Sequence, residues 1–193
     1  MTEANLPLRP LLSPLAALQR LLDQYEGKCV IIGGVAVSLL GTPRLTADID
    51  ALILLSIEDL PELLQIAEAE GLTGRITDLL EFARKNRVVL LRHAESGTGI
   101  DISLGMLPFE EEMIARSVEY DVEGMKIRLP TPEDLIILKA VAHRPKDLLD
   151  IQGIINSHPD LDHQHIRNWV QQFSELLAMP EIWEDIDAFF SVS

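Results

Sequence analysis

Two aspartates lie two residues apart in the apolar segment ADIDALILL, residues 47–55. Because side chains alternate along a β-strand, Asp48 and Asp50 are expected on one face of a strand that is otherwise apolar. Neighbouring carboxylates repel each other, and their removal from water adds a further penalty. A divalent cation such as Mg²⁺ relieves both problems, since paired Asp oxygens are suitable ligands for it. The alternatives are exposure to water at the start of the strand or pairing with Arg44.

A third carboxylate occupies a similar position later in the chain. Asp101 lies between Ile100 and Ile102 in the segment GIDISLG, and it would share one strand face with Ser103. If both strands belong to one sheet, three carboxylates can converge on one or two metal ions. Two metals would activate an attacking hydroxyl and stabilise the leaving phosphate oxygen of an in-line displacement. A phosphatase with an Asp nucleophile is disfavoured, because its aspartates would follow the first strand without a preceding Gly-Gly helix.

The pair Gly33-Gly34 separates the apolar segments KCVII and VAVSLL. Without Cβ atoms, such a turn lets a triphosphate approach the backbone, and the N-terminus of the following helix favours anions. A tight turn between a strand and a helix is the simpler explanation for the same residues. The glycine pair therefore indicates a phosphate site only in combination with the two aspartates.

Charged residues in the C-terminal part allow two interpretations each. Lys139 is the only charge in the segment LIILKAVAH, and it would either extend from a buried helix to solvent or reach a phosphate group. Lys146 and Asp150 are four residues apart and can form a helical ion pair. Asp147 lies in a first helical turn, where a carboxylate complements the helix dipole.

The segment HPDLDHQH, residues 158–165, suggests a metal site at first sight. His163 and His165 are two residues apart and would not share a helix face, so a structural role is favoured, with Asp162 as a helix N-cap. Cys29 has no histidine near it in the sequence, so a thiol nucleophile is not expected.

The formal net charge of −15 over 193 residues argues against a broad basic face for nucleic acid. The chain has one dense basic stretch, which forms either a local patch or the solvated ends of strands and helices: Arg75, Arg84, Lys85, Arg87 and Arg92. No apolar run is long enough to cross a bilayer, and a single cysteine cannot form an internal disulfide. A cytoplasmic protein without membrane contact is expected.

The hydrophobic periodicity predicts an α+β fold. Helices are expected at residues 13–25, 35–40, 56–71, 77–86 and 108–117, strands at 28–32, 47–55, 87–93 and 99–105, and a hairpin at 118–130. Ser13 is the expected cap of the first helix. Four more helices are expected from Thr131, itself an N-cap, at 131–143, 144–157, 161–179 and 180–190. We therefore predict an α+β core over residues 1–130 and a helical extension over residues 131–193 packed on it.

Taken together, these segments resemble the polymerase-β-type nucleotidyltransferase superfamily. The resemblance rests on IIGG at 31–34, DIDA at 48–51 and IDIS at 100–103. More narrowly, GGVAVSLLGTPRLTADIDALI and TPEDLIILKAVAHRPKDLLDI are similar to the AbiEii/AbiGii-toxin-like nucleotidyltransferases. The late signature of that family falls on Lys139, Arg144, Lys146, Asp147 and Asp150.

This resemblance implies a mixed sheet flanked by helices and the transfer of NMP from an NTP, such as ATP, to a hydroxyl group. Asp48, Asp50 and Asp101 would be catalytic and would hold Mg²⁺, as one ion or two. The implied nucleotide-binding residues are Gly33, Gly34, Ser38, Arg44, Thr46, Lys139 and Lys146. The acceptor would be RNA, such as tRNA, or a protein, and a toxin of this kind would have an antitoxin partner.

Two features differ from the pattern of the superfamily. Gly34 stands where the best-known members have Ser, which removes a hydroxyl contact to phosphate. A basic motif after the strand with two aspartates is also missing, with only Arg84, Lys85 and Arg87 near its place. The alternative is therefore a catalytically inactive module with the same fold that binds a nucleotide or a partner.

Overall fold

The computed structural model describes residues 8–191. Its centre is a five-stranded mixed sheet with the order β1-β2-β5-β4-β3. These strands are β1 (Cys29–Ile32), β2 (Asp48–Ile53), β3 (Leu72–Gly74), β4 (Val88–His93) and β5 (Gly99–Leu104). Strands β2 and β5 are parallel, and the other neighbours in this sheet are antiparallel. A separate hairpin follows, formed by β6 (Val118–Val122) and β7 (Met125–Leu129).

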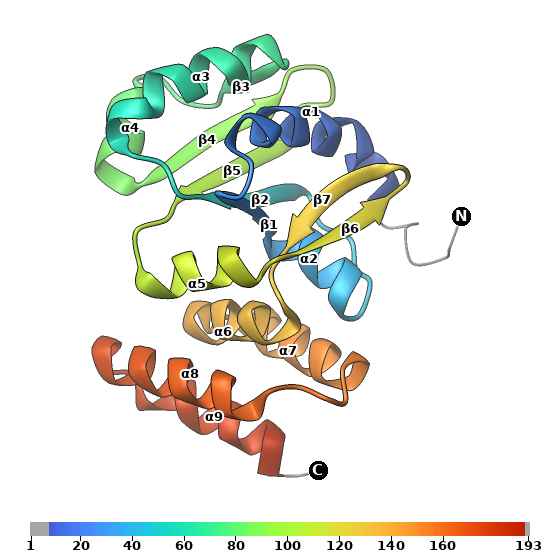
Figure 1. Ribbon diagram of the computed structural model, residues 1–193, viewed down its shortest axis with the longest axis vertical. Coiled ribbons are helices and arrows are strands. Elements are labelled where there is room, and N and C mark those ends of the chain that lie inside the picture. The colour runs from blue at the N-terminus through green and yellow to red at the C-terminus, as the bar shows by residue number, and fades with distance from the viewer. Residues whose placement is uncertain (1–7, 192–193) are drawn as a thin grey trace.

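Helices lie on both faces of the five-stranded sheet (Figure 1). One side carries α1 (Leu12–Leu22), α3 (Leu60–Ala69) and α4 (Leu79–Asn86), and the other carries α2 (Gly33–Leu40), α5 (Pro108–Arg116) and α6 (Pro132–Ala142). The chain continues through α7 (Pro145–Ser157), α8 (His163–Leu177) and α9 (Pro180–Ser191). Short 3-10 turns occupy Asp23–Tyr25 and Ile57–Asp59. The predicted fold class, a mixed sheet flanked by helices, is confirmed.

The two faces of β2 differ in polarity, as its sequence predicts. Ile49, Ala51 and Ile53 alternate along one face and are fully buried. Burial of an isoleucine side chain contributes about 1.5–3 kcal/mol, so this face anchors the strand in the core. The opposite face carries Asp48 and Asp50 at its start. The core on one side thus holds the carboxylates at a fixed place on the other.

Side-chain caps position the C-terminal helices. The hydroxyl of Thr131 accepts a hydrogen bond from the N–H of Asp134 at 3.2 Å, which caps α6. The carboxylate of Asp162 accepts one from the N–H of His165 at 3.0 Å, which caps α8. Both caps were predicted. The imidazole of His165 also contacts Asp134, with 2.7 Å between Nε2 and Oδ1, so it ties α8 to α6.

Three local predictions were wrong or incomplete. Ser13 does not cap α1, because residues 8–11 already form a 3-10 turn and the helix begins at Leu12. Helix α2 begins at Gly33 rather than at residue 35, so the glycine pair belongs to its first turn. Strand β3 was not predicted, because its three residues are too few to show an alternating pattern.

Within residues 8–191, no helix combines the length and the apolar character that a membrane span requires. The division of the chain at residue 130 stays a prediction. Its outer limits, residues 1–7 and 192–193, lie outside the described residues.

Candidate functional site

The parallel pairing of β2 with β5 brings three predicted carboxylates together. Asp50 lies directly opposite Asp101, and Asp48 lies opposite Gly99. Residues opposite each other on paired strands share a face, and so do residues two apart on one strand. Asp48, Asp50 and Asp101, called the carboxylate triad below, therefore lie on one face of the sheet. Asp48 is exposed, while Asp50 and Asp101 are half-buried.

The glycine pair at the start of α2 makes room for the triad. Gly33 has a φ of +64°, and a Cβ atom there would lie 2.6 Å from the carboxyl carbon of Asp50. A Cβ atom at Gly34 would lie 2.7 Å from the Cβ of Thr46. Both distances are shorter than real contacts allow, so Asp50 and Thr46 fill the space that the glycines leave open. The same turn donates the N–H of Gly34 to the Asp50 carboxylate.

The triad stores unfavourable electrostatic energy in two of its members. Burial raises the pKa of the Asp50 carboxyl, and the nearby Asp48 raises that pKa further. Burial also raises the pKa of the Asp101 carboxyl, an effect that Arg75 opposes and Asp50 adds to. Lys139 and Arg144 act in the opposite direction on the pKa of Asp50, so in both groups the nearby positive charge does not offset the cost of burying the ionised carboxylate.

Among the residues that the structure describes, one arginine forms an ion pair with the triad. Arg75 follows β3, and its guanidinium forms an ion pair with Asp101. The basic stretch that contains Arg75 does not act as one patch, because Arg75, Arg84 and Arg87 have different partners. Arg84 pairs with Glu81 at 2.6 Å, while Arg87 donates to the carbonyl oxygen of Leu104 at 3.0 Å.

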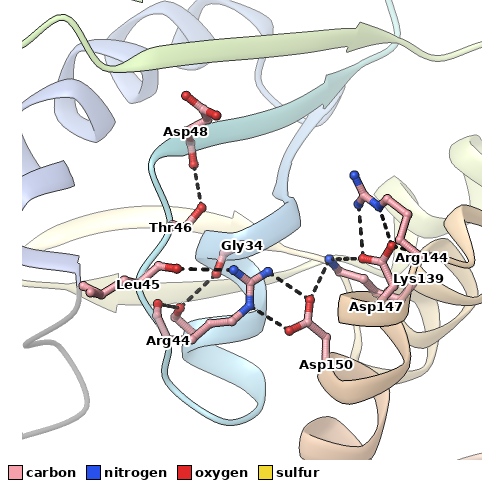
Figure 2. A network of polar contacts seen from close by, with 10 residues as sticks. Gly34, Arg44, Leu45, Thr46, Asp48, Lys139, Arg144, Asp147 and Asp150 are labelled. Atoms are coloured by element: carbon pink, nitrogen blue, oxygen red, sulfur yellow. Dashed lines mark hydrogen bonds and ion pairs between the residues drawn. The ribbon is translucent and has the colours of Figure 1, made fainter.

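A chain of ion pairs lies beside the triad, on α6, α7 and the segment before β2 (Figure 2). Arg44 binds Asp150 through two hydrogen bonds of 2.7 and 2.9 Å. Lys139 lies 2.9 Å from both Asp150 and Asp147. Arg144 completes the chain through Asp147, at 2.5 Å. We call these five residues the cation network, since three cations share two carboxylates.

The two carboxylates of the cation network are well compensated. Burial alone would raise their pKa values, but hydrogen bonds from Arg44 and Lys139 bring the pKa of Asp150 below its usual value. Arg144 and Lys139 lower the pKa of Asp147 in the same way. The predicted helical pair of Lys146 with Asp150 is absent, because Asp150 is occupied by Arg44 and Lys139. Lys146 is exposed and forms no ion pair within the described part of the chain.

A cleft of about 360 Å³ joins the triad to the cation network. Nine of the ten predicted site residues line it: Gly33, Gly34, Arg44, Thr46, Asp48, Asp50, Asp101, Lys139 and Lys146. Ser38 does not. It is buried, with its hydroxyl 2.9 Å from the carbonyl oxygens of both Gly34 and Arg44, so it braces the turn from beneath.

The cleft also contains residues that the sequence did not single out for the site: Ile32, Ser103, Leu135, Leu138, Ala142 and Arg144. Arg144 belongs to the late signature of the resembling family, but it is not among the predicted nucleotide-binding residues. The three apolar side chains of α6 became recognisable only once that helix was seen to form one wall. A larger cavity, of about 560 Å³, lies between α1, β1 and the β6–β7 hairpin and shares no lining residue with the cleft.

Among residues 8–191, no three His, Cys, Asp or Glu side chains are arranged as a ready metal site. The Asp101 carboxylate is turned to Arg75 instead. The donor types still match a hard divalent cation, which prefers carboxylate oxygens.

The sequence matches the profile of a family described as nucleotidyltransferase of unknown function (DUF6036) over residues 8–180. The chain belongs to this DUF6036 family. The expectation of a nucleotidyltransferase is thereby confirmed, and the protein is a nucleotidyltransferase by family. A sequence comparison with curated proteins finds no match.

Solved structures share the fold of this DUF6036 member at low sequence identity. The antibiotic-resistance factor ANT(2'')-Ia matches with a TM-score of 0.56 and 18% identity, over 90% of this chain and 94% of that one. An antigenic nucleotidyltransferase-like protein from Paracoccidioides brasiliensis matches with a TM-score of 0.53 and 18% identity, over 93% and 92%. JHP933 from Helicobacter pylori matches with a TM-score of 0.50 and 16% identity, over 100% and 83%.

Proposed function

We propose that this protein is a Mg²⁺-dependent nucleotidyltransferase that transfers NMP from an NTP to a hydroxyl group of RNA, such as tRNA, or of a protein. One observation carries the proposal. A single cleft holds the carboxylate triad at one end and positively charged side chains at the other. A nucleoside triphosphate needs both, because its phosphates are anionic and its reacting phosphorus requires metal ions or cations around it.

The triad is assigned as the Mg²⁺ site. Mg²⁺ is held by one or two carboxylates together with substrate phosphates and water, and Asp48 and Asp50 offer such a pair. The missing Cβ of Gly33 leaves the Asp50 carboxylate its place at the wall of the cleft. When bound, the metal would supply positive charge at the reacting phosphate and at the leaving pyrophosphate.

The protein's own residues divide the remaining tasks. Asp101 lies opposite Asp50 and is assigned as a metal ligand or as the base for the incoming hydroxyl. A raised pKa suits the second role, since a base must hold the proton that it takes up. Lys146 and Arg144 are exposed at the other end of the cleft, where we assign them to the β- and γ-phosphates.

The acceptor and the biological role are taken from the narrower resemblance. The glycine–aspartate segment and the late signature are similar to AbiEii/AbiGii-type toxins, so we propose a toxin with an antitoxin as its partner. The net charge of −15 makes a broad RNA footprint unfavourable. An RNA acceptor would therefore enter by its end, and a protein acceptor by an exposed loop.

The first test is calorimetric titration of each NTP with and without Mg²⁺. The variants are Asp48→Asn/Asp50→Asn and, as a control, Asp160→Asn, which removes an exposed carboxylate far along the chain in the turn before α8. We expect Mg²⁺-dependent binding of at least one NTP to wild type and to the control, and none to the double variant. Absence of NTP binding by wild type would overturn the proposal.

The second test identifies transfer. An α-³²P-labelled form of the bound NTP is incubated with separate RNA and protein fractions, and label retained in one fraction names the acceptor class. Binding without transfer to any fraction would favour the alternative, an inactive nucleotide-binding module. The absence of a hydroxyl at Gly34 and the missing basic motif after the strand with two aspartates motivate this alternative.

A further inference from the structure

Arg75 is placed at the triad by the sheet rather than by its neighbours in sequence. Its backbone N–H donates to the carbonyl oxygen of Leu90 at 3.0 Å, which fixes it at the β3 edge. Since the strand order is β5-β4-β3, the side chain must cross β4 to reach Asp101 on β5. Of the ion pairs among residues 8–191, this is the one that involves a triad carboxylate.

The guanidinium lies near a second member of the triad. A Cβ atom at Gly99 would come within 2.9 Å of Nη1 of Arg75 and would also contact the carboxylate of Asp48. Both side chains therefore border the same small space. The side chains of Arg75 and Asp101 are 30% and 35% exposed, so solvent reaches their ion pair. Ion pairs this exposed are weak, and a competing cation can displace the guanidinium.

A guanidinium and a divalent cation compete for the same carboxylate oxygens. Both are positive, so they repel each other at contact distance, and Asp101 can serve only one of them fully. We propose that Arg75 is an internal counter-ion of the triad, which occupies Asp101 until a divalent cation displaces it and thereby lowers the metal affinity of the site. This inference rests on the proposed metal site.

The arrangement gives Arg75 two effects of opposite sign. Without metal, its charge offsets the repulsion among the three carboxylates and keeps Asp101 in place. With metal, the same charge opposes binding. Arg75 is therefore a positioning residue that sets the metal concentration at which the triad fills.

The test is a titration with Mn²⁺ alone, followed by electron paramagnetic resonance of the free ion. Arg75→Gln removes the charge and keeps a polar side chain. Arg92→Gln is the matched control, because Arg92 lies opposite Gly99 on β4, on the same face, and is exposed. We expect Arg75→Gln to lower the Kd for Mn²⁺ about tenfold, which corresponds to about 1.4 kcal/mol. Arg92→Gln should change it less than about twofold.

A structural role for Arg75 predicts the opposite direction, since a disordered triad binds metal more weakly. An unchanged or raised Kd in Arg75→Gln overturns the inference, and so does an equal decrease in both variants, which would reflect net charge. Asp48→Asn/Asp50→Asn separates this failure from that of the proposed function. If the double variant abolishes Mn²⁺ binding and Arg75→Gln leaves the Kd unchanged, the counter-ion role is overturned and the metal site is retained. No Mn²⁺ binding by wild type or Arg75→Gln overturns both.

Discussion

The two ends of the cleft treat their aspartates in opposite ways. In the cation network, Asp147 and Asp150 are shared by three cations, and their pKa values are lowered. In the triad, Arg75 forms the one ion pair found within residues 8–191, and the pKa values of Asp50 and Asp101 are raised. The negative charge of an aspartate is thus compensated by cations in the network, whereas in the triad the nearby positive charge does not offset the effect of burial.

This difference indicates that the two ends of the cleft have different roles: the cation network supports the wall of the cleft, and the triad is suited to bind a cation. The compensated aspartates hold Arg44 and Lys139 against the wall of the cleft and have little capacity left for a ligand. The triad gains most from an added cation, because the ionised carboxylates of Asp50 and Asp101 are electrostatically unfavourable there. A buried aspartate therefore indicates a ligand site only when the cations around it do not already compensate its charge.

The largest effect should come from removing a compensated aspartate. Asp147→Ala leaves the buried ammonium of Lys139, 5% exposed, with one carboxylate fewer, and loss of one partner of a buried ion pair costs about 3–5 kcal/mol. Asp50→Ala should change the free energy of unfolding by less than about 1 kcal/mol, since it also removes a desolvated charge. Urea denaturation of both variants measures this contrast. Equal losses would break the comparison between the two ends.

A smaller effect is expected at the glycine that borders the triad. Gly33→Ala introduces a left-handed alanine, which costs about 1–2 kcal/mol, and also displaces the Asp50 carboxylate. Gly71→Ala is the matched control, because its φ is +76° and no atom lies within 4 Å of the added Cβ. Urea denaturation should show destabilisation of both variants, larger in Gly33→Ala because its added Cβ also overlaps Asp50. Mg²⁺-dependent NTP titration should show loss of binding only in Gly33→Ala. Normal binding by Gly33→Ala would mean that the Asp50 position is not critical.

Local sequence patterns predicted the residues of the cleft better than their contacts. The alternation in ADIDALILL placed Asp48 and Asp50 on one face. The caps at Thr131 and Asp162 could be predicted because each side chain bonds to an N–H only three residues later. Short patterns suffice there because the physics involved is local. The glycine pair was recognised in the same way, although it belongs to the first turn of α2 and does not precede the helix.

Contacts between distant segments could not be predicted in this way. The local pattern favoured a Lys146–Asp150 pair, but Arg44, 106 residues away, binds Asp150 through two hydrogen bonds instead. The two-point geometry of a guanidinium on a carboxylate outcompetes a flexible exposed ammonium. Arg75 was hidden for the same reason, since its approach to Asp101 depends on the unpredicted strand β3.

The smallest effect, and the one that separates the two ends most directly, is the pH dependence of stability. The folded-state pKa of Asp50 is raised, so its contribution is most favourable below the unfolded pKa and declines as pH rises through the folded value. The folded-state pKa of Asp147 is lowered, so its contribution is present above the unfolded pKa and is lost as pH falls through the folded value. With unfolded Asp titrating near 3.9, Asp50→Asn should therefore gain stability relative to wild type as pH rises above about 4. The stability that Asp147→Asn lacks relative to wild type should be constant above about pH 4 and should disappear as pH falls below it. Urea denaturation at several pH values measures both slopes, and slopes of the same sign would show that the two ends do not differ in electrostatic compensation.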